Sequence, residues 1–368
     1  MAKCIFYTYA YNAEKTLERA VGSVLAQEGD FVYYLMDNGS TDQKTGEMIQ
    51  RLAAEDSRII PLRNRQNQVW EPGVIWWEIA RQHDPDDVLC FLDADDTYHS
   101  YFLKTMLEFL EEEQLDIAVC GSDFLNAATG ERIGARSRQS DLLIRGHGFS
   151  YYFPQYHQYM RTLWGKLYRM SLFQDMEYTH FLPFTYGSDT LITSEAFLRA
   201  SRIGIKSGTL HEYYMSPTSV SYQSGEGRAE ALEPLYNVPE TLLEAKCGRI
   251  TDRNRDFLTC VYLNDTKDAL RIILKAEDPV GKKLDSLALI FGSRPMLLSL
   301  AAPSQKQGVM ADEVRRLMPE ILEFVRSWLL SLDEVPDEKV DVFCQVGECV
   351  CGALGDQAGE QFFRQLRK

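Results

Sequence analysis

The stretch that decides the fold of this chain is Val88-Leu89-Cys90-Phe91-Leu92-Asp93-Ala94-Asp95-Asp96. Its apolar first part is typical of a short strand in a parallel sheet covered on both faces, where apolar and polar residues no longer alternate. Three carboxylates follow at the strand end where open α/β sheets bind ligands. Such close carboxylates repel one another unless a cation neutralises them, and oxygen ligands suit Mg2+ or Mn2+. The alternative is an acidic turn and a helix N-cap, because aspartate favours both.

Short apolar strands and amphipathic helices alternate around this stretch. The sequence predicts further strands over residues 3–9, 31–36, 59–62, 116–124 and 203–214. It predicts helices after Asn12, around Met48, and over residues 72–83, 100–113, 163–173 and 189–200. Asn12 is expected to cap the first helix, and Thr129-Gly130 to form the turn of a hairpin. This alternation implies right-handed crossovers and an α/β fold, with a mainly parallel, Rossmann-like sheet flanked by helices.

The character of the chain changes near residue 228. Helical patterns dominate from there, over residues 229–243, 253–275 and 314–330, with few strand signals. The sequence therefore predicts two parts, an α/β domain over residues 1–227 and a separate α-helical C-terminal region over 228–368. The role of the helical region and the oligomeric state stay open.

The overall charge narrows the classes of partner. The formal net charge of −15 over 368 residues argues against nucleic acid and anionic membranes as bulk electrostatic partners, but leaves room for a local basic pocket. No apolar stretch approaches the roughly 20 residues of a spanning helix, and no signal-peptide pattern is present. The eight cysteines lack C-x-x-C pairing, which favours reduced thiols. We therefore expect a cytoplasmic protein without a transmembrane segment.

A second polar cluster follows another predicted strand. It is Asp37-Asn38-Gly39-Ser40-Thr41-Asp42, directly after residues 31–36. Because parallel strands share a polarity, this cluster and the acids at 93–96 are expected at the same edge of one sheet. A carboxylate in the first cluster could accept hydrogen bonds from a base or ribose, while the second could hold a cation on a diphosphate. The alternative is that Asp37 and Asp42 only stabilise a turn and cap a helix.

Six sequence blocks, in order over about residues 1–225, carry a resemblance together. They are Tyr9-Ala10-Tyr11-Asn12-Ala13-Glu14 with Leu17, Ser23, Val24, Leu25 and Gln27; residues 37–42; Asp93-Ala94-Asp95-Asp96; Trp164-Gly165-Lys166-Leu167-Tyr168-Arg169; Gly187-Ser188-Asp189; and Tyr213-Tyr214 with Ser219-Val220-Ser221. This series resembles the motifs of a family 2 glycosyltransferase of the GT-A fold, which uses nucleotide-activated sugars. Asn38, Gly165 and Ser188 stand where the family has Asp, Asn and Glu.

The resemblance implies roles for particular residues. The nucleotide-sugar would be bound by Ala10, Tyr11, Asn12, Asp37, Asn38, Asp42, Asp93, Ala94 and Lys166. Asp95 would be the first ligand of Mn2+ or Mg2+, with Asp93 on ribose or the metal and His211 as a further ligand. Asp189 would be the general base, with a helix N-cap as its alternative role, and Asp96 is expected to cap the helix that follows it. Residues 136–159, aromatic and without clear periodicity, would form loops and short helices along an acceptor cleft.

The function that the resemblance implies is a metal-dependent, inverting glycosyltransferase of the hexosyltransferase type. It would move a sugar from a nucleotide-sugar, with UDP-sugars favoured, to a glycan or lipid-linked acceptor in surface polysaccharide synthesis, with peripheral contact at the inner face of the membrane. One alternative is a non-catalytic nucleotide- or glycan-binding relative, of which Asn38 and Ser188 would be signs. Another is a sugar-nucleotidyltransferase, but that class requires a glycine-rich phosphate loop after the first strand, and this chain has Ala10-Tyr11-Asn12 there. The donor sugar, the acceptor and the linkage stay open.

Overall fold

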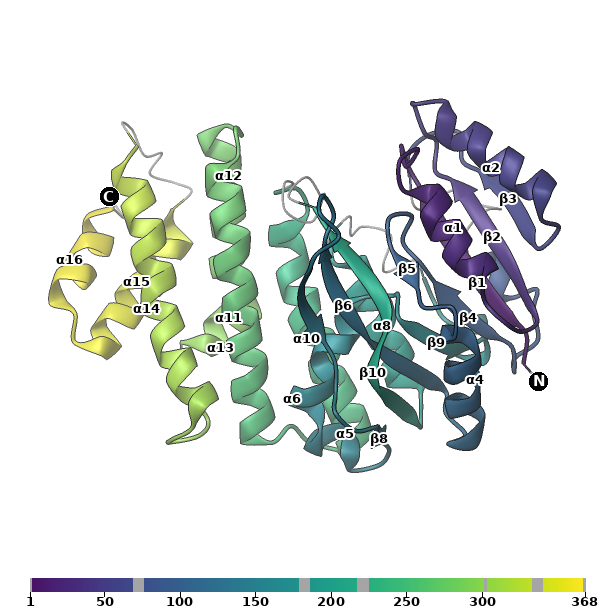
Figure 1. The fold of residues 1–368 in the computed structure, drawn as a ribbon. Coiled ribbons are helices and arrows are strands. Elements are labelled where there is room, and N and C mark those ends of the chain that lie inside the picture. The colour runs from purple at the N-terminus through teal and green to yellow at the C-terminus, as the bar shows by residue number, and fades with distance from the viewer. Residues whose placement is uncertain are drawn as a thin grey trace. The chain divides into compact units, whose positions relative to one another are not determined.

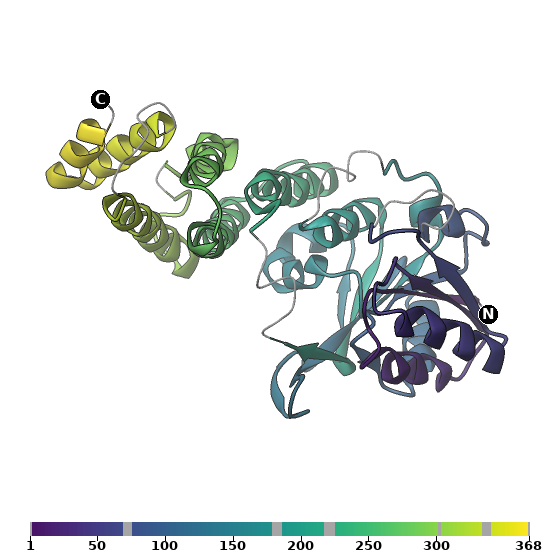
Figure 2. The same ribbon diagram turned by 90° about the horizontal axis from the view of Figure 1, so that it is seen from above.

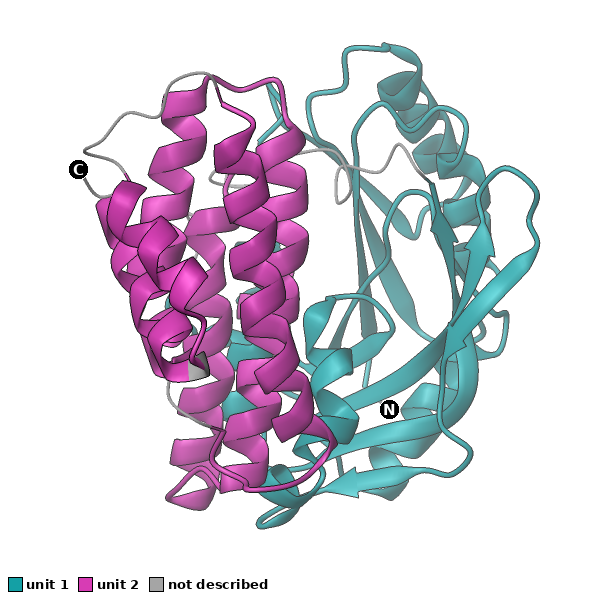
Figure 3. Ribbon diagram, turned by 90° about the vertical axis from the view of Figure 1, so that its left-hand side faces the viewer, with its two compact units in different colours: residues 1–182, 192–217 teal, residues 183–191, 218–368 magenta. Residues whose placement is uncertain are grey.

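A computed structural model describes residues 2–68, 76–178, 186–216, 225–300, 303–332 and 340–366. The chain divides into two compact units, residues 1–182 with 192–217 and residues 183–191 with 218–368 (Figure 3). We describe each unit by itself. The observed division falls about ten residues before the predicted boundary at 227/228, and that boundary stays a prediction. The end of the sixth sequence block, residues 219–221, lies outside the described residues.

The first unit is built on one sheet, which runs through the right-hand part of Figure 1. Its described strands are β1 (Cys4–Ala10), β2 (Phe31–Asp37), β3 (Ile59–Arg63), β4 (Val88–Phe91), β5 (Thr97–Tyr98), β6 (Ile117–Asn126), β7 (Arg132–Arg136), β8 (Leu142–Ile144), β9 (Lys166–Arg169) and β10 (Ile203–Met215). Their order is β3-β2-β1-β4-β9-β6-β10-β5, with β7 on β6 and β8 on β10. Neighbours from β3 to β4 are parallel, as are β6 and β10, whereas β9 is antiparallel to both β4 and β6. The α/β fold class is confirmed, with a mixed sheet.

Helices cover this sheet, and their bounds follow the apolar periodicity. The described ones are α1 (Leu17–Leu25), α2 (Lys44–Glu55), α3 (Trp76–Ala80), α4 (Phe102–Glu112), α5 (Gly148–Tyr151), α6 (Phe153–Tyr156), the 3-10 helix η1 (His157–Arg161), α7 (Ser171–Gln174) and α8 (Ser188–Arg199), the last shared between the units. In α1 the buried residues Leu17, Ala20, Val21 and Val24 recur at helical spacing, which places one apolar face on the sheet. The strand β4 is buried at every position, as predicted.

Two local predictions were wrong. The helix predicted over residues 163–173 is the strand β9 followed by the short helix α7, since Leu167 and Tyr168 are both fully buried between neighbouring strands. Asn12 does not cap α1, which begins at Leu17 with Thr16 at the capping position. Asn12 instead has a φ of 50° and turns the chain after β1. Of the helix predicted over 72–83, residues 72–75 lie outside the described residues.

The second unit is helical in its described part, as predicted (Figure 2). Its helices are α10 (Arg228–Cys247), α11 (Asp252–Lys275), α12 (Val280–Gly292), α13 (Arg294–Ser299), α14 (Val309–Leu330), α15 (Asp341–Leu354) and α16 (Gln357–Leu366). Thr251 caps α11 by accepting a hydrogen bond from the Asn254 backbone, and Lys267 of α11 pairs with Glu320 of α14. Among the described helices none is both long and apolar enough to cross a membrane.

Candidate active site

Three strand ends meet at one edge of the sheet. Ala10 pairs with Asp37 in the β1–β2 register, and the Asn38 backbone N–H donates to the Ala10 carbonyl at 2.8 Å. On the other side of β1, the Leu92 N–H donates to the Tyr7 carbonyl at 3.0 Å. The segments that follow β1, β2 and β4 therefore all begin at the same edge of the sheet. This confirms that the two polar clusters share one edge.

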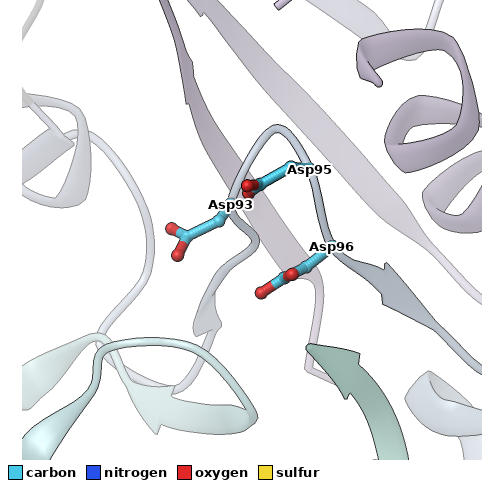
Figure 4. A group of neighbouring side chains, drawn as sticks. All are labelled: Asp93, Asp95 and Asp96. Carbon is cyan, nitrogen blue, oxygen red and sulfur yellow. The ribbon is translucent and has the colours of Figure 1, made fainter. Parts of the chain in front are cut away.

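The acidic turn after β4 brings three carboxylates together (Figure 4). Asp93, Asp95 and Asp96 can each offer one oxygen, and these oxygens lie within 4.8 Å of one another. Asp93 is exposed, whereas Asp96 is fully buried. Burial raises the pKa of Asp95, and burial together with the charge of Asp95 raises the pKa of Asp96. A hard divalent cation fits this set of oxygen donors, because it would relieve the repulsion that the geometry creates.

Asp96 joins the acidic turn to β10. One of its carboxylate oxygens accepts a hydrogen bond from the Tyr214 backbone N–H at 2.9 Å, and the other lies 3.3 Å from His211 Nε2. The helix α4 begins only at Phe102, so the expectation that Asp96 caps the next helix was wrong.

His211, the third predicted metal ligand, is fully buried beside Asp96. Its Nδ1 lies 3.2 Å from the Ser122 hydroxyl. Burial, helped by the charges of Arg136 and Lys166, lowers the pKa of this imidazole well below its ordinary value. His211 thus reaches the acidic turn through Asp96, and direct coordination of a metal by His211 stays a prediction.

Arg19 on α1 is a site residue that the sequence did not reveal. Its Nη2 donates to the Asp95 carbonyl at 2.5 Å, and its guanidinium lies 3.5 Å from the centre of the Tyr214 ring. A cation therefore holds the backbone of the acidic turn from the side of α1. No sequence motif marks this residue, because it is one exposed position of an amphipathic helix.

Asp37 is the buried carboxylate at the end of β2. Its Oδ1 accepts a hydrogen bond from the Ser40 backbone N–H at 2.9 Å, and its Oδ2 lies 3.4 Å from Arg63 Nε. Gly46 in α2 makes room for that second oxygen, since a Cβ at Gly46 would stand 2.7 Å from it. One oxygen thus shapes the turn, and the other is the candidate acceptor for a ligand.

Asn38 connects the β2 end to the segment after β3. Its Oδ1 accepts hydrogen bonds from Asn64 Nδ2 at 2.6 Å and from the Gln68 backbone at 3.2 Å. Its Nδ2 donates to Asn67 Oδ1 at 3.0 Å. An amide can make both kinds of bond, whereas an ionised carboxylate only accepts. The departure from the family's Asp at this position therefore has a structural role in this chain.

Asn12 and Asp42 hold the first polar cluster in shape. Asn12 Oδ1 accepts hydrogen bonds from the backbone N–H groups of Thr41 and Asp42, at 2.8 and 3.1 Å. Asp42 accepts from the backbone and the hydroxyl of Thr45, at 3.1 and 2.7 Å, at the start of α2. These contacts are those of turn and cap residues, and a direct role for either in nucleotide binding stays a prediction.

The remaining predicted residues differ in exposure. Tyr11 is 43% exposed beside the site, and Ala94 is partly exposed within the acidic turn. Lys166 is fully buried in β9, and its ammonium donates to the Thr162 and Trp164 carbonyls at 2.6 and 3.0 Å. A contact of Lys166 with the donor phosphates stays a prediction, and it would have to draw the ammonium away from these acceptors.

Asp189, the predicted base, lies in the first turn of α8 and is exposed. It follows Gly187, which has a φ of 77°. Residues 183–191 group with the second compact unit, whereas the acidic turn belongs to the first. The approach of Asp189 to the acidic turn therefore stays a prediction.

Comparison with known proteins relates the site to a family. The sequence profile described as Glycosyl transferase family 2 matches residues 6–176, a range that contains the strand ends of β1, β2 and β4 and the acidic turn. The α/β part of this chain, which contains the site, therefore matches the profile of the family 2 glycosyltransferases.

Two similar proteins are named as glycosyltransferases. The uncharacterized glycosyltransferase EpsJ of Bacillus subtilis (strain 168) is 22% identical over 214 residues, which is 57% of this chain and 60% of EpsJ. The uncharacterized glycosyltransferase YibD of Escherichia coli (strain K12) is 24% identical over 247 residues, 65% of this chain and 69% of YibD.

Crystal structures of residues 1–349 of S. aureus TarS are similar along the whole chain. The complex with UDP-GlcNAc matches at 16% identity with a TM-score of 0.48, covering 100% of this chain and 90% of that one. The complex with UDP matches at 17% identity, also with a TM-score of 0.48 and the same coverage.

Proposed function

We propose that this protein is a metal-dependent, inverting glycosyltransferase. It moves a sugar, in our proposal a hexose, from a nucleotide-sugar, with UDP-sugars favoured, to a glycan or lipid-linked acceptor. The observation that carries the proposal is the acidic turn at the same sheet edge as the buried Asp37. This arrangement supports a divalent cation next to a nucleoside pocket. A role in surface polysaccharide synthesis, with peripheral contact at the inner face of the membrane, is part of the proposal.

The donor would be held from two sides. Asp37 would accept hydrogen bonds from the base or ribose, while Asn12 and Asn38 keep the surrounding turns in place. Asp95, with Asp93, would hold Mn2+ or Mg2+, and Asp96 would fix the turn through its bond to Tyr214. When bound, the cation offsets the negative charge that develops on the departing diphosphate.

Asp189 would act on the acceptor. As general base it would take the proton of an acceptor hydroxyl, whose oxygen attacks the anomeric carbon. The new carbon–oxygen bond forms opposite the bond to the leaving phosphate oxygen, which breaks, so the anomeric configuration inverts. Ser188 cannot supply the second carboxylate that the family has before this base, so the acceptor would rely on other groups for its orientation.

The test measures UDP release from UDP-hexoses, with Mn2+ present or removed by EDTA. We expect release only with the metal, and a loss of at least about a hundredfold in Asp95→Asn. Asp189→Asn should bind UDP with Mn2+ as the natural chain does, yet transfer no sugar. The matched control is Asp86→Asn, an exposed aspartate before β4 at the opposite strand end, which should keep full activity.

Two results would contradict the proposal. UDP release that is equal with and without EDTA would show that the reaction needs no metal. Near-normal transfer by Asp189→Asn would show that Asp189 is not the general base. Metal-independent nucleotide binding without turnover of any UDP-hexose would favour a non-catalytic relative instead.

A further inference from the structure

One part of this acidic chain is strongly basic. Residues 132–169 contain seven cationic side chains and a single acidic one, Asp141, within a chain of net charge −15. Asp141 is already paired with Lys206 at 2.8 Å. The segment therefore carries more positive charge than its own acidic side chain can offset.

Some of these cations have acidic partners elsewhere in the first unit. Arg132 pairs with Asp123 at 2.6 Å, and Arg169 pairs with Glu111 at 2.9 Å. Arg136 and Arg138 differ, because among the described residues they bond only to uncharged groups. Arg136 donates to the Gln158 carbonyl and the Thr162 hydroxyl, at 2.8 and 3.3 Å, and Arg138 donates to Gln155 Oε1 at 3.0 Å.

Three neighbouring side chains of this segment have buried donors without a hydrogen-bond partner among the described residues. Arg136 and Arg138 are two residues apart, and the Arg136 guanidinium lies 4.9 Å from the centre of the Tyr159 ring. Within the described structure, the Nε atoms of both arginines and the Tyr159 hydroxyl are buried and have no hydrogen-bond partner. Tyr159 as a whole is fully buried. Buried polar groups are normally satisfied, so three such donors together point to a ligand that accepts hydrogen bonds.

The electrostatics agree with this geometry. Burial lowers the pKa of Arg136 to about 10, which means that the site disfavours its charge in the absence of an anion. Burial also raises the pKa of Tyr159, while the charges of Arg136 and Arg138 act in the opposite direction.

The cluster is connected to the acidic turn by stacked rings. The Arg136 guanidinium lies 4.7 Å from the centre of the Trp164 ring, and Trp164 stacks on His211 with centroids 4.4 Å apart. His211 in turn lies 3.3 Å from Asp96. The segment with the unpartnered donors is thus connected to the acidic turn through Trp164 and His211, although none of these donors follows β1, β2 or β4.

We propose that Arg136, Arg138 and Tyr159 bind a phosphate group carried by the acceptor. The inference rests on the proposed function and adds the chemical class of the acceptor. Phosphate suits the cluster because it offers several oxygens to donors that approach from different side chains, and guanidinium groups bind it through paired N–H bonds. The phosphate belongs either to a lipid carrier or to a phosphodiester within a glycan, and the test separates these sources.

The test measures binding of four probes to the full chain by calorimetry: farnesyl phosphate, farnesol, a glycerol phosphodiester and glycerol. EDTA is present so that no metal bridges a phosphate to the acidic turn. We expect at least one phosphate probe to bind about tenfold more tightly than its neutral counterpart. Preference for farnesyl phosphate indicates a lipid carrier, and preference for the diester indicates a phosphorylated glycan.

Three variants and a matched control locate the binding. Arg138→Gln should weaken the preferred phosphate probe about tenfold, while Arg136→Lys and Tyr159→Phe should weaken it several-fold. Arg132→Gln removes an equal charge from the same basic segment but from a pair with Asp123, so it should leave binding within about twofold. Each variant should keep the Mn2+-dependent binding of UDP, which shows that the donor site is intact.

The inference is overturned if the phosphate probes bind no better than the neutral ones. It is also overturned if Arg132→Gln weakens binding as much as Arg138→Gln, because bulk charge then explains the effect. Failure of the proposed function looks different, since it shows in the release of UDP from UDP-hexoses with and without EDTA, whatever the phosphate probes do.

Discussion

Gly46 shows that the position of one functional carboxylate depends on a residue without a side chain. A Cβ at this helix position would lie 2.7 Å from Asp37 Oδ2, the oxygen that the Ser40 turn does not use. An alanine would therefore move either α2 or the Asp37 carboxylate. Because Asp37 is buried, this displacement would change the position of its carboxylate in the nucleoside pocket that we propose.

The first prediction concerns Gly46→Ala. We expect UDP affinity in the presence of Mn2+ to fall about tenfold, the effect of losing one hydrogen bond to a charged group. Calorimetric titration with UDP measures the loss, and chemical denaturation reports the stability of the variant.

Gly22→Ala is the matched control. Gly22 lies in α1, and a Cβ there would meet no atom within 4 Å. This variant should bind UDP normally and gain up to about 1 kcal/mol of stability from helix propensity. Equal UDP affinities for the two variants would show that Gly46 does not position Asp37 for binding.

At the scale of elements, the turns after β1 and β2 form one connected structure. The Asn12 side chain bonds the backbone of Thr41 and Asp42, and the Ala13 backbone bonds the Thr45 hydroxyl at 2.8 Å. Asn12 also has a φ of 50°, which asparagine and glycine tolerate better than other residues. Its side chain and its backbone conformation therefore contribute separately.

The second prediction separates these contributions. Asn12→Gly keeps the backbone conformation and removes the side-chain bonds, so it should weaken UDP binding several-fold. Asn12→Ala should weaken binding similarly and lower the free energy of unfolding by about 1 kcal/mol more than Asn12→Gly, because alanine is strained at this φ. UDP titration and urea unfolding of both variants measure the difference. Indistinguishable stabilities would show that the φ at residue 12 carries no strain.

The elements that the sequence predicted well are those with a strong local pattern. β1, β2 and β4 are apolar runs that end in turn residues, so both their existence and their shared edge could be predicted. β9 could not, because Lys166 and Tyr168 make its four residues look amphipathic, while tertiary contacts bury both side chains.

The contacts that complete the site are remote in sequence. The pairing of Asp96 with Tyr214 spans 118 residues, and the bond from Arg19 to Asp95 spans 76. Nothing in the local pattern around Asp96 distinguishes this partner from the helix cap that the sequence favours. Prediction from sequence therefore reached the residues at the strand ends, but not the residues that hold them.

At the scale of the whole molecule, a buried histidine links stability to pH. His157 is buried, and burial lowers its pKa to about 3 from an ordinary value near 6.5. Between these pH values the unfolded chain binds a proton on this ring and the folded chain does not. Lowering the pH from about 6.5 toward 3 should therefore lower the free energy of unfolding, by at most about 1.4 kcal/mol per pH unit for this group.

The third prediction is that His157→Gln reduces the slope of the free energy of unfolding against pH between pH 6 and pH 4. The reduction should correspond to about one proton fewer taken up on unfolding. Urea unfolding at a series of pH values measures the slope for both proteins. Ser194→Ala is the control, because it changes another buried polar side chain that gains no proton in this range. Parallel curves for the natural chain and His157→Gln would contradict the prediction.

The bond between Asp96 and the Tyr214 backbone also sets an order of events during synthesis. The acidic turn leaves the ribosome long before β10, the strand whose backbone binds Asp96. Loops of this length close slowly, so the nascent chain exposes three mutually repelling aspartates before their geometry is defined. A chain stopped after residue 176 would contain every residue that the family profile matches and still lack Tyr214 and His211. The final geometry around Asp96 is therefore a late product of folding, reached only when the last strand of the sheet has been made.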